Sequence, residues 1–114
     1  MMLRLLMATL VSLSCTAAGA PKLSALVIDG LNNHDWAAGT RAIQSILEGS
    51  GRFTVTVSTW PAKPDFRGYD VVISNFNGGH TADGTRWPRE VEQALENYVR
   101  GGGALVVFHP TTRS

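Results

Sequence analysis

The chain has 114 residues, with 10 lysines and arginines against 9 aspartates and glutamates. This length allows at most one domain of modest size. The arginines are scattered singly, and the basic cluster that typically follows a nucleic-acid backbone is absent, so we expect no nucleic-acid partner.

Residues 1–20 have the three parts of a secretory signal peptide. Arg4 supplies the positive end, Leu5 to Leu13 supply the apolar stretch, and Ala18 to Ala20 give a small-residue cleavage pattern. The apolar stretch is shorter than the roughly 20 residues that cross a bilayer. We therefore expect a secreted or periplasmic protein without a stable membrane span.

Two features of this segment stay open. Cleavage after Ala20 would leave Pro21 first, so cleavage after Ala18 is an alternative. Cys15 is the only cysteine, and lipid attachment to it is a minor alternative, because Ser12 to Ser14 precede it in a poor order for that signal. Removal of the segment with Cys15 would leave a chain without disulfides or a cysteine nucleophile.

The domain, placed at residues 21–114, opens with an apolar run from Leu23 to Ile28. A nearly continuous run of this kind is typical of a strand that helices cover on both faces. Asp29 ends the run, and the polar loop from Asn32 to Asp35 follows. In parallel α/β sheets ligands bind at the carboxyl ends of the strands, so this loop is a candidate site.

A helix is predicted from about Trp36 to Glu48, with Asp35 as its N-cap. Phe53 to Thr59 alternates β-branched and aromatic residues with smaller polar ones, which predicts a second strand and completes a β-α-β unit. The stretch from Trp60 to Gly68 contains two prolines and reads as an irregular connection.

The second half repeats this pattern. Tyr69 to Asn75 is a predicted strand, and Phe76 to Arg86 is a second polar loop. An i, i+3, i+4, i+7 apolar face predicts a helix from Pro88 to Arg100. Three glycines end that helix, and the strand from Ala104 to Phe108 then delivers His109 at its end.

These elements predict a three-layer, doubly wound parallel sheet of flavodoxin-like type, with strand order 2-1-3-4. In this order the strand ends at Asp29, Asn75 and His109 meet along one edge. The sequence stops at Ser114, where the next crossover would start, so the domain looks truncated. The fourth strand would keep an open apolar edge, through which the chain could self-associate.

Two histidines are the candidate catalytic residues, since histidine exchanges protons near neutral pH. His34 lies in the first loop and His109 at the end of the fourth strand. The candidate ligand-binding residues are carboxylate or amide side chains near the strand ends: Asp29, Asn32, Asn33, Asn75 and Asn77. Each has a plain structural alternative, as a turn former, a partner of backbone amides or a residue that shapes the helix entry.

Other classes of site have weak support. The three histidines and the nearby aspartates show no close metal-ligand spacing, so no metal is expected. Phosphate-binding and dinucleotide-binding glycine motifs are absent, and no cofactor is predicted. The tryptophans could stack on sugar rings, but two of them lie at helix starts, which favours packing.

Three segments, ALVIDGLNNHDW, YDVVISNFNG and WPREVEQALENYVRGGGALVVFH, resemble the N-terminal part of the ThuA-like family in residues and spacing. The resemblance covers about Lys22 to His109. The family takes its name from trehalose utilisation, and its fold is similar to that of class I glutamine amidotransferases without their cysteine. The ending HPTTRS departs from the family pattern.

The resemblance implies an exported domain that binds or processes a carbohydrate or polyol at the strand-end crevice. Two alternatives stay open beside it. One is a non-catalytic binding or interaction module, and the other is an inactive truncated fragment of a longer ThuA-like protein.

Overall fold

The computed structural model describes residues 19–78 and 84–108. The signal peptide predicted at residues 1–20 therefore lies almost entirely outside the described residues, and so does the candidate catalytic residue His109. No helix in the described stretches is long and apolar enough to cross a membrane.

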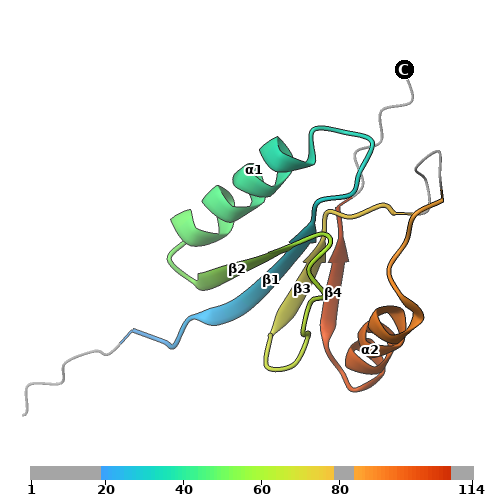
Figure 1. Cartoon of the computed structure of the whole chain (residues 1–114). Coiled ribbons are helices and arrows are strands. Elements are labelled where there is room, and N and C mark those ends of the chain that lie inside the picture. Colours follow the sequence, from blue (N-terminus) through green and yellow to red (C-terminus); the bar gives the residue numbers. More distant parts are fainter. Residues whose placement is uncertain (1–18, 79–83, 109–114) are drawn as a thin grey trace, which may run out of the picture.

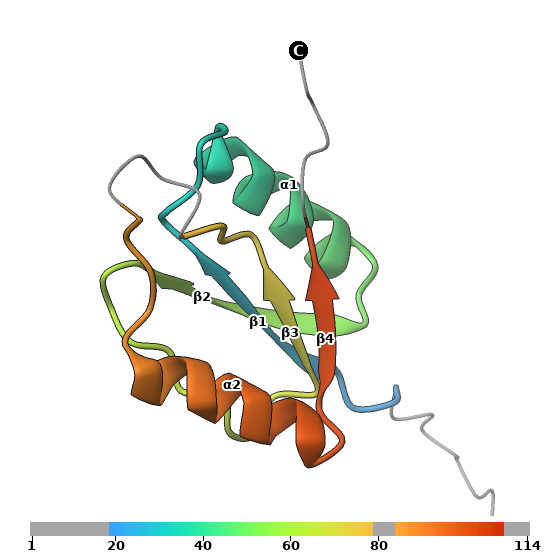
Figure 2. The same ribbon diagram turned by 90° about the vertical axis from the view of Figure 1, so that its right-hand side faces the viewer.

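Four strands and two helices alternate along the described chain: β1 (Leu23–Asp29), α1 (Trp36–Gly49), β2 (Phe53–Thr59), β3 (Val71–Ser74), α2 (Arg89–Arg100) and β4 (Ala104–Val107). The strands form one parallel sheet in the order β2-β1-β3-β4, which confirms the predicted topology. Helix α1 covers one face of the sheet and α2 covers the other, giving the three layers seen in Figure 1 and, from the side, in Figure 2.

The central strand β1 forms the core on both faces of the sheet, as its apolar run predicts. Leu26 and Ile28 pack toward α2 with Phe66, Trp87 and Val91. Alternate residues of a strand point to opposite faces, so Ala25 and Val27 lie on the α1 side, where Ile43 and Leu47 cover them. The core is therefore two apolar layers with β1 between them.

Helix α1 begins as predicted, because the Asp35 carboxylate accepts a hydrogen bond from the Ala38 amide at 3.0 Å. It ends at Gly49, one residue beyond the predicted end. Its apolar residue Ile46 is 72% exposed. The side of α1 that carries Ile46 faces beyond β4, where the described chain provides no further strand.

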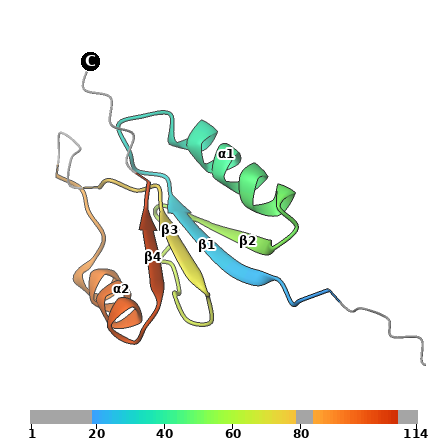
Figure 3. The same cartoon turned by 180° about the vertical axis from the view of Figure 1, so that it is seen from behind.

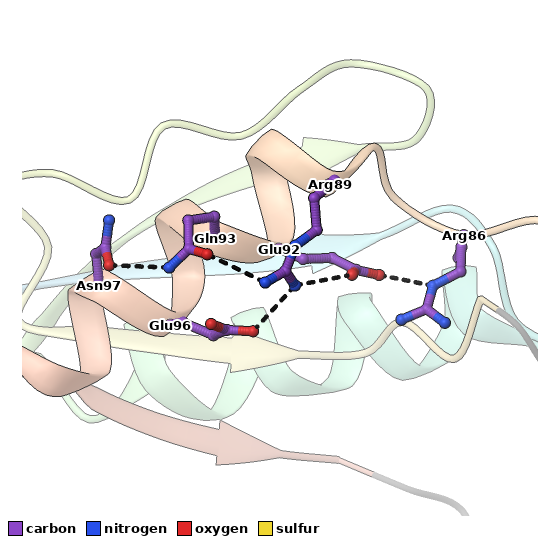
Figure 4. Close-up of polar contacts among 6 residues, drawn as sticks. All are labelled: Arg86, Arg89, Glu92, Gln93, Glu96 and Asn97. Atoms are coloured by element: carbon purple, nitrogen blue, oxygen red, sulfur yellow. Dashed lines mark hydrogen bonds and ion pairs between the residues drawn. The ribbon is translucent and has the colours of Figure 1, made fainter.

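Helix α2 is preceded by Pro88, which is its N-cap and not a member of its first turn. One side of α2 carries a row of polar contacts, shown in Figure 4. Arg86 binds Glu92 at 2.7 Å, and Arg89 binds Glu96 at 3.3 Å. These exposed ion pairs each contribute little to stability, so the packing of the inner face must hold α2 on the sheet.

The third strand is shorter than predicted, because β3 spans Val71–Ser74 and not Tyr69 to Asn75. The flanking residues still bond to β1: the Asp70 amide donates to the Ser24 carbonyl, and the Asn75 amide donates to the Ile28 carbonyl, each at 2.9 Å. The stretch between β2 and β3 holds no helix or strand, as predicted.

Candidate functional site

The carboxyl ends of β1 and β3 lie side by side, because the two strands are parallel and Ile28 is paired with Ser74. The next residue on each strand is polar, Asp29 on β1 and Asn75 on β3. The loops that continue from these residues therefore start next to each other, at the upper end of the sheet in Figure 1. This is the edge at which the sequence predicts the site.

A buried polar chain joins the two strand ends to α1. The Thr40 hydroxyl donates to Oδ2 of Asp29 at 2.6 Å. The same Thr40 oxygen accepts from Nδ2 of Asn75 at 3.0 Å, and that amide also donates to the Trp36 carbonyl at 2.9 Å. Asp29 and Asn75 are each only 1% exposed, so they hold the first turns of α1 and do not face solvent.

Gly39 allows this close approach of α1. A Cβ atom at this position would lie 3.1 Å from Nδ2 of Asn75, closer than a relaxed contact. A glycine inside a helix normally costs about 1 kcal/mol relative to alanine. The glycine gives α1 room to approach Asn75, because the side chain of a larger residue would be too close to the Asn75 amide.

The two loops are tied together by asparagine side chains. Nδ2 of Asn32 donates a long hydrogen bond of 3.4 Å to Oδ1 of Asn75, and Nδ2 of Asn77 donates to Oδ1 of Asn33 at 2.8 Å. Oδ1 of Asn32 accepts from the His34 amide at 3.0 Å, which closes the turn into α1. We call Asn32, Asn33, Asn75 and Asn77 the asparagine cluster.

Two buried oxygen atoms at this edge have no hydrogen-bond partner among residues 19–78 and 84–108. They are Oδ1 of Asp29 and Oδ1 of Asn77. Buried polar atoms are nearly always bonded in proteins, and exceptions often mark a functional group or an ordered water. Within the described residues, Asn77 of the cluster and Asp29 beneath it thus each keep an unused hydrogen-bond acceptor near amides that are already held in place.

The six predicted site residues within the described stretches gather at this one edge, but they differ in access. Asn33 is exposed, and Asn32, His34 and Asn77 are half-buried. These four can touch a ligand. Asp29 and Asn75 lie beneath them and support their positions. The place of His109 relative to them lies outside the described residues.

Thr40 is the member of the site that sequence reasoning missed. It is buried at 6% exposure and bonds both strand ends, yet the sequence shows only a polar residue within the apolar stripe of α1. The signal that could have revealed it is its place one turn into the helix, next to Gly39. A hydroxyl there can reach back to the strand end where the helix began.

Two hollows in the described structure lie away from the asparagine cluster and have mostly apolar walls. One of about 470 Å³ lies between α2 and the sheet, with Ile28, Leu95 and Leu105 in its walls. Another of about 240 Å³ lies between α1 and β4. Among residues 19–78 and 84–108, no group of three or more His, Cys, Asp or Glu side chains could hold a metal ion.

The fold and this edge define a class, a flavodoxin-like α/β domain with polar loops at the ends of its strands. No family model and no curated protein matches the chain. One solved structure does match, that of a protein from Parabacteroides merdae described as ThuA-like, with a TM-score of 0.68 and 32% identity.

The match covers 78% of this chain and 33% of the Parabacteroides chain, so the sequence spans about a third of the length of that protein. Over that part the chain is similar in sequence and fold to this ThuA-like protein, which confirms the resemblance carried by the three sequence segments.

Proposed function

We propose that the asparagine cluster and His34 form part of a site for a carbohydrate or polyol. The observation that carries the proposal is the pair of bonds that join the loops, Asn32 to Asn75 and Asn33 to Asn77. Carboxamides both donate and accept hydrogen bonds, which suits the hydroxyl groups of a sugar. The ThuA-like resemblance points to the same class of ligand.

The buried chain below the loops supports binding by keeping these amides in place before a ligand arrives. Asn75 is held by Thr40 and by the Trp36 carbonyl, and it in turn accepts from Asn32. A site whose side chains are already ordered loses less conformational entropy when it binds. Asn33, which is exposed, and the half-buried Asn77 to which it is bonded would make direct contacts.

In a complete ThuA-like protein His34 would act as a general base toward a ligand hydroxyl, together with His109 if that residue reaches the same edge. The proposal therefore includes catalysis by the complete ThuA-like protein, with His34 as its general base.

A non-catalytic binding module is the second candidate, and one observation favours it. The Asp29 carboxylate is buried and takes its hydrogen bond from Thr40, so within residues 19–78 and 84–108 it does not orient the ring of His34. Binding without turnover by the chain would support this second candidate.

Nuclear magnetic resonance tests the proposal directly. Monosaccharides, disaccharides such as trehalose, and linear polyols would be titrated into the 15N-labelled chain. We expect the side-chain amide signals of Asn32, Asn33 and Asn77 and the backbone amide of His34 to shift. The side-chain amide of Asn97 is the internal control, since it lies on α2, across the sheet from the α1 helix that the cluster contacts.

Alanine variants sharpen this test. Asn33→Ala and Asn77→Ala should each weaken binding about tenfold, since each removes about one hydrogen bond's worth of free energy. Gln93→Ala, which breaks an exposed amide pair with Asn97 on α2, should leave the affinity unchanged. Shifts centred on α2, or equal binding by all three variants, would contradict a site at the asparagine cluster.

Export is proposed as well, on the charged end, apolar stretch and small-residue site of residues 1–20. Expression with a functional secretion system should yield a chain that starts after Ala18 or Ala20. N-terminal sequencing that still finds Met1 would count against it.

A further inference from the structure

Asn77 is the one asparagine of the five in the sequence that glycine follows. An Asn-Gly pair is the dipeptide most prone to spontaneous deamidation, because glycine has no side chain to obstruct the approach of its own backbone nitrogen to the asparagine carboxamide. Asn77 and Gly78 lie between β3 and α2, outside the helices and strands. The backbone of this pair is therefore not fixed by the hydrogen bonds of a helix or a strand.

The packing around Gly78 requires a glycine at this position. A Cβ atom there would lie 2.5 Å from the ring of Phe76, well inside van der Waals contact. The Phe76 ring is stacked on Trp87, with ring centroids 4.8 Å apart, and lies against Trp60 at 5.9 Å, so it has little room to move aside. The structure thus keeps a glycine directly after Asn77, and with it the reactive pair.

Few contacts hold the Asn77 side chain itself. Among the described residues its Nδ2 donates to Oδ1 of the exposed Asn33 at 2.8 Å, and its Oδ1 has no partner. Asn75, by contrast, is buried, and its Nδ2 donates two hydrogen bonds. The Asn77 carboxamide is therefore freer than that of Asn75 to turn toward the Gly78 nitrogen.

Asn77 also connects the two loops at the end of the sheet. Figure 3 shows, from behind, that the segment after β3 leaves the same end of the sheet as the loop between β1 and α1. The Asn77 backbone amide donates to the Leu31 carbonyl at 3.0 Å, and its side chain bonds Asn33. A chemical change at residue 77 therefore acts on both loops at once.

We propose that Asn77 is a site of spontaneous deamidation, which loosens the connection between the two loops. The backbone nitrogen of Gly78 loses its proton to water and attacks Cγ of Asn77. The new N–Cγ bond forms as the Cγ–Nδ2 bond breaks, and Nδ2 takes up a proton and leaves as ammonia. Water then opens the cyclic imide at either of its two carbonyl groups, which gives isoaspartate or aspartate at residue 77. Water is the only co-reactant, and no atom changes its oxidation state.

Isoaspartate lengthens the main chain between residue 77 and Gly78 by one carbon atom. Gly78 packs against the Phe76 ring without space for even a Cβ atom, so the added carbon must displace one of the two. The carboxamide that donates to Asn33 is lost as well. This product therefore breaks the side-chain bond between the loops and disturbs the packing next to it.

Aspartate keeps the main chain but replaces a donor by an acceptor. Both oxygens of a carboxylate only accept hydrogen bonds, so the bond from residue 77 to Oδ1 of Asn33 is lost. Asn33 regains a contact only by turning its own amide group round, which reverses the direction of the bond. The proposed sugar site includes Asn77, so either product should also weaken sugar binding, and this consequence alone rests on the proposed function.

The reaction is tested by incubating the purified chain in mildly alkaline and in mildly acidic buffer and measuring the masses of its proteolytic peptides over time. Asn77 should gain the mass that accompanies exchange of its NH2 group for OH, and it should do so faster in alkaline buffer, because only the deprotonated nitrogen attacks. The rate should be at least about tenfold higher than at Asn97, which lies within α2. A peptide of residues 73–79 gives the rate of the same sequence without the fold.

Two variants separate the reaction from its effect on the loops. Asn77→Gln keeps a carboxamide but places it one carbon further from the backbone nitrogen, so residue 77 should gain no mass. Asn97→Gln is the matched control on α2 and should leave the rate at Asn77 unchanged. In the aged wild-type chain the Asn33 side-chain amide signals and the Trp87 indole signal should shift, whereas in Asn77→Gln they should stay constant over the same time.

Asn77→Asp carries the aspartate product on an unaltered main chain, so it should shift the Asn33 signals but not the indole signal of Trp87, which stacks on Phe76. Mass gain at Asn77 that is no faster than at Asn97, while the peptide reacts, would overturn the proposal. Mass gain at Asn77 with unchanged Asn33 signals would overturn its effect on the loops. None of these readouts involves a sugar, so this proposal and the carbohydrate site can fail separately.

Discussion

The Thr40 hydroxyl lies 2.6 Å from Oδ2 of Asp29, and both side chains are buried. This contact joins the first helix to the end of the central strand. Among the described residues, Oδ1 of Asp29 has no partner and Thr40 supplies the side-chain hydrogen bond to Oδ2. The Thr40 hydrogen bond thus lowers the free-energy cost of burying the Asp29 carboxylate at the strand end.

Thr40→Val should lower the free energy of unfolding by about 1 to 3 kcal/mol, because the variant keeps the shape of threonine but removes the hydroxyl that donates to a buried carboxylate. Thr40→Ser keeps the hydroxyl and should retain most of the stability. Urea unfolding followed by circular dichroism measures both. Thr54→Val on the exposed side of β2 is the control and should change stability by less than about 0.5 kcal/mol.

The same pair of variants reports on the asparagine cluster. Thr40 holds Asn75, and Asn75 accepts from Asn32, so Thr40→Val should also shift the side-chain amide signals of Asn32. Thr40→Ser should leave them in place. If Thr40→Val lowers stability while the Asn32 signals stay unchanged, the inference that Thr40 positions Asn32 through Asn75 is wrong.

The order of the sheet was predictable because its determinants are local. The continuous apolar run of β1 marks a strand buried on both faces, and right-handed crossovers then leave few topologies. Burial at the β4 edge was not predictable in the same way. The apolar stripe of α1 includes Ile46, but whether a stripe residue is buried depends on how far the sheet extends beneath the helix.

That these candidate residues gather at one edge of the sheet was predictable, but how deeply each of them is buried was not. Strand order alone brings Asp29 next to Asn75, and the loops with Asn32 and Asn77 follow from that. Which of these side chains face solvent depends on the depth of α1, and Gly39 and Thr40 set that depth. The spacing of apolar residues in the sequence predicts that α1 is a helix, but it does not predict how closely α1 approaches the strand ends.

The N-cap of α1 provides a second stability prediction. Asp35→Ala removes the acceptor of the Ala38 amide and should lower the free energy of unfolding by about 1 kcal/mol. Asp35→Ser keeps a capping oxygen and should recover most of that loss. Thermal or urea unfolding of the three proteins checks it, and equal stability of Asp35→Ala and wild type would show that the cap contributes nothing.

Two glycines form a matched pair for a third prediction. Gly30 follows β1 with φ at 99°, and a Cβ there would lie 2.7 Å from the Trp60 amide nitrogen. Gly30→Ala should therefore cost about 2 kcal/mol or more from the backbone conformation and the clash. Gly49→Ala, at the end of α1 with open space around it, should be neutral or stabilising. Similar effects of the two changes on the urea midpoint would argue against the tight turn.

Asp65 supplies a prediction for acid pH. The Arg67 side chain and its backbone amide donate to this carboxylate, with a shortest contact of 2.7 Å, and they lower the pKa of Asp65 from 3.8 to about 2. A pKa that is lower in the folded protein stabilises the fold above pH 3.8, and this contribution is lost as the pH falls toward 2. The pair is fully exposed, so its effect on stability is small and the titration itself is the measurement.

In a carbon-detected titration by nuclear magnetic resonance, the Asp65 carboxyl should therefore have its midpoint near 2. Arg67→Ala removes the guanidinium but keeps the backbone donor, so the midpoint should rise part of the way toward 3.8. Arg41→Ala, an exposed arginine of α1, is the control and should leave it unchanged. A midpoint that stays near 2 in Arg67→Ala would show that the backbone amide alone lowers the pKa of Asp65.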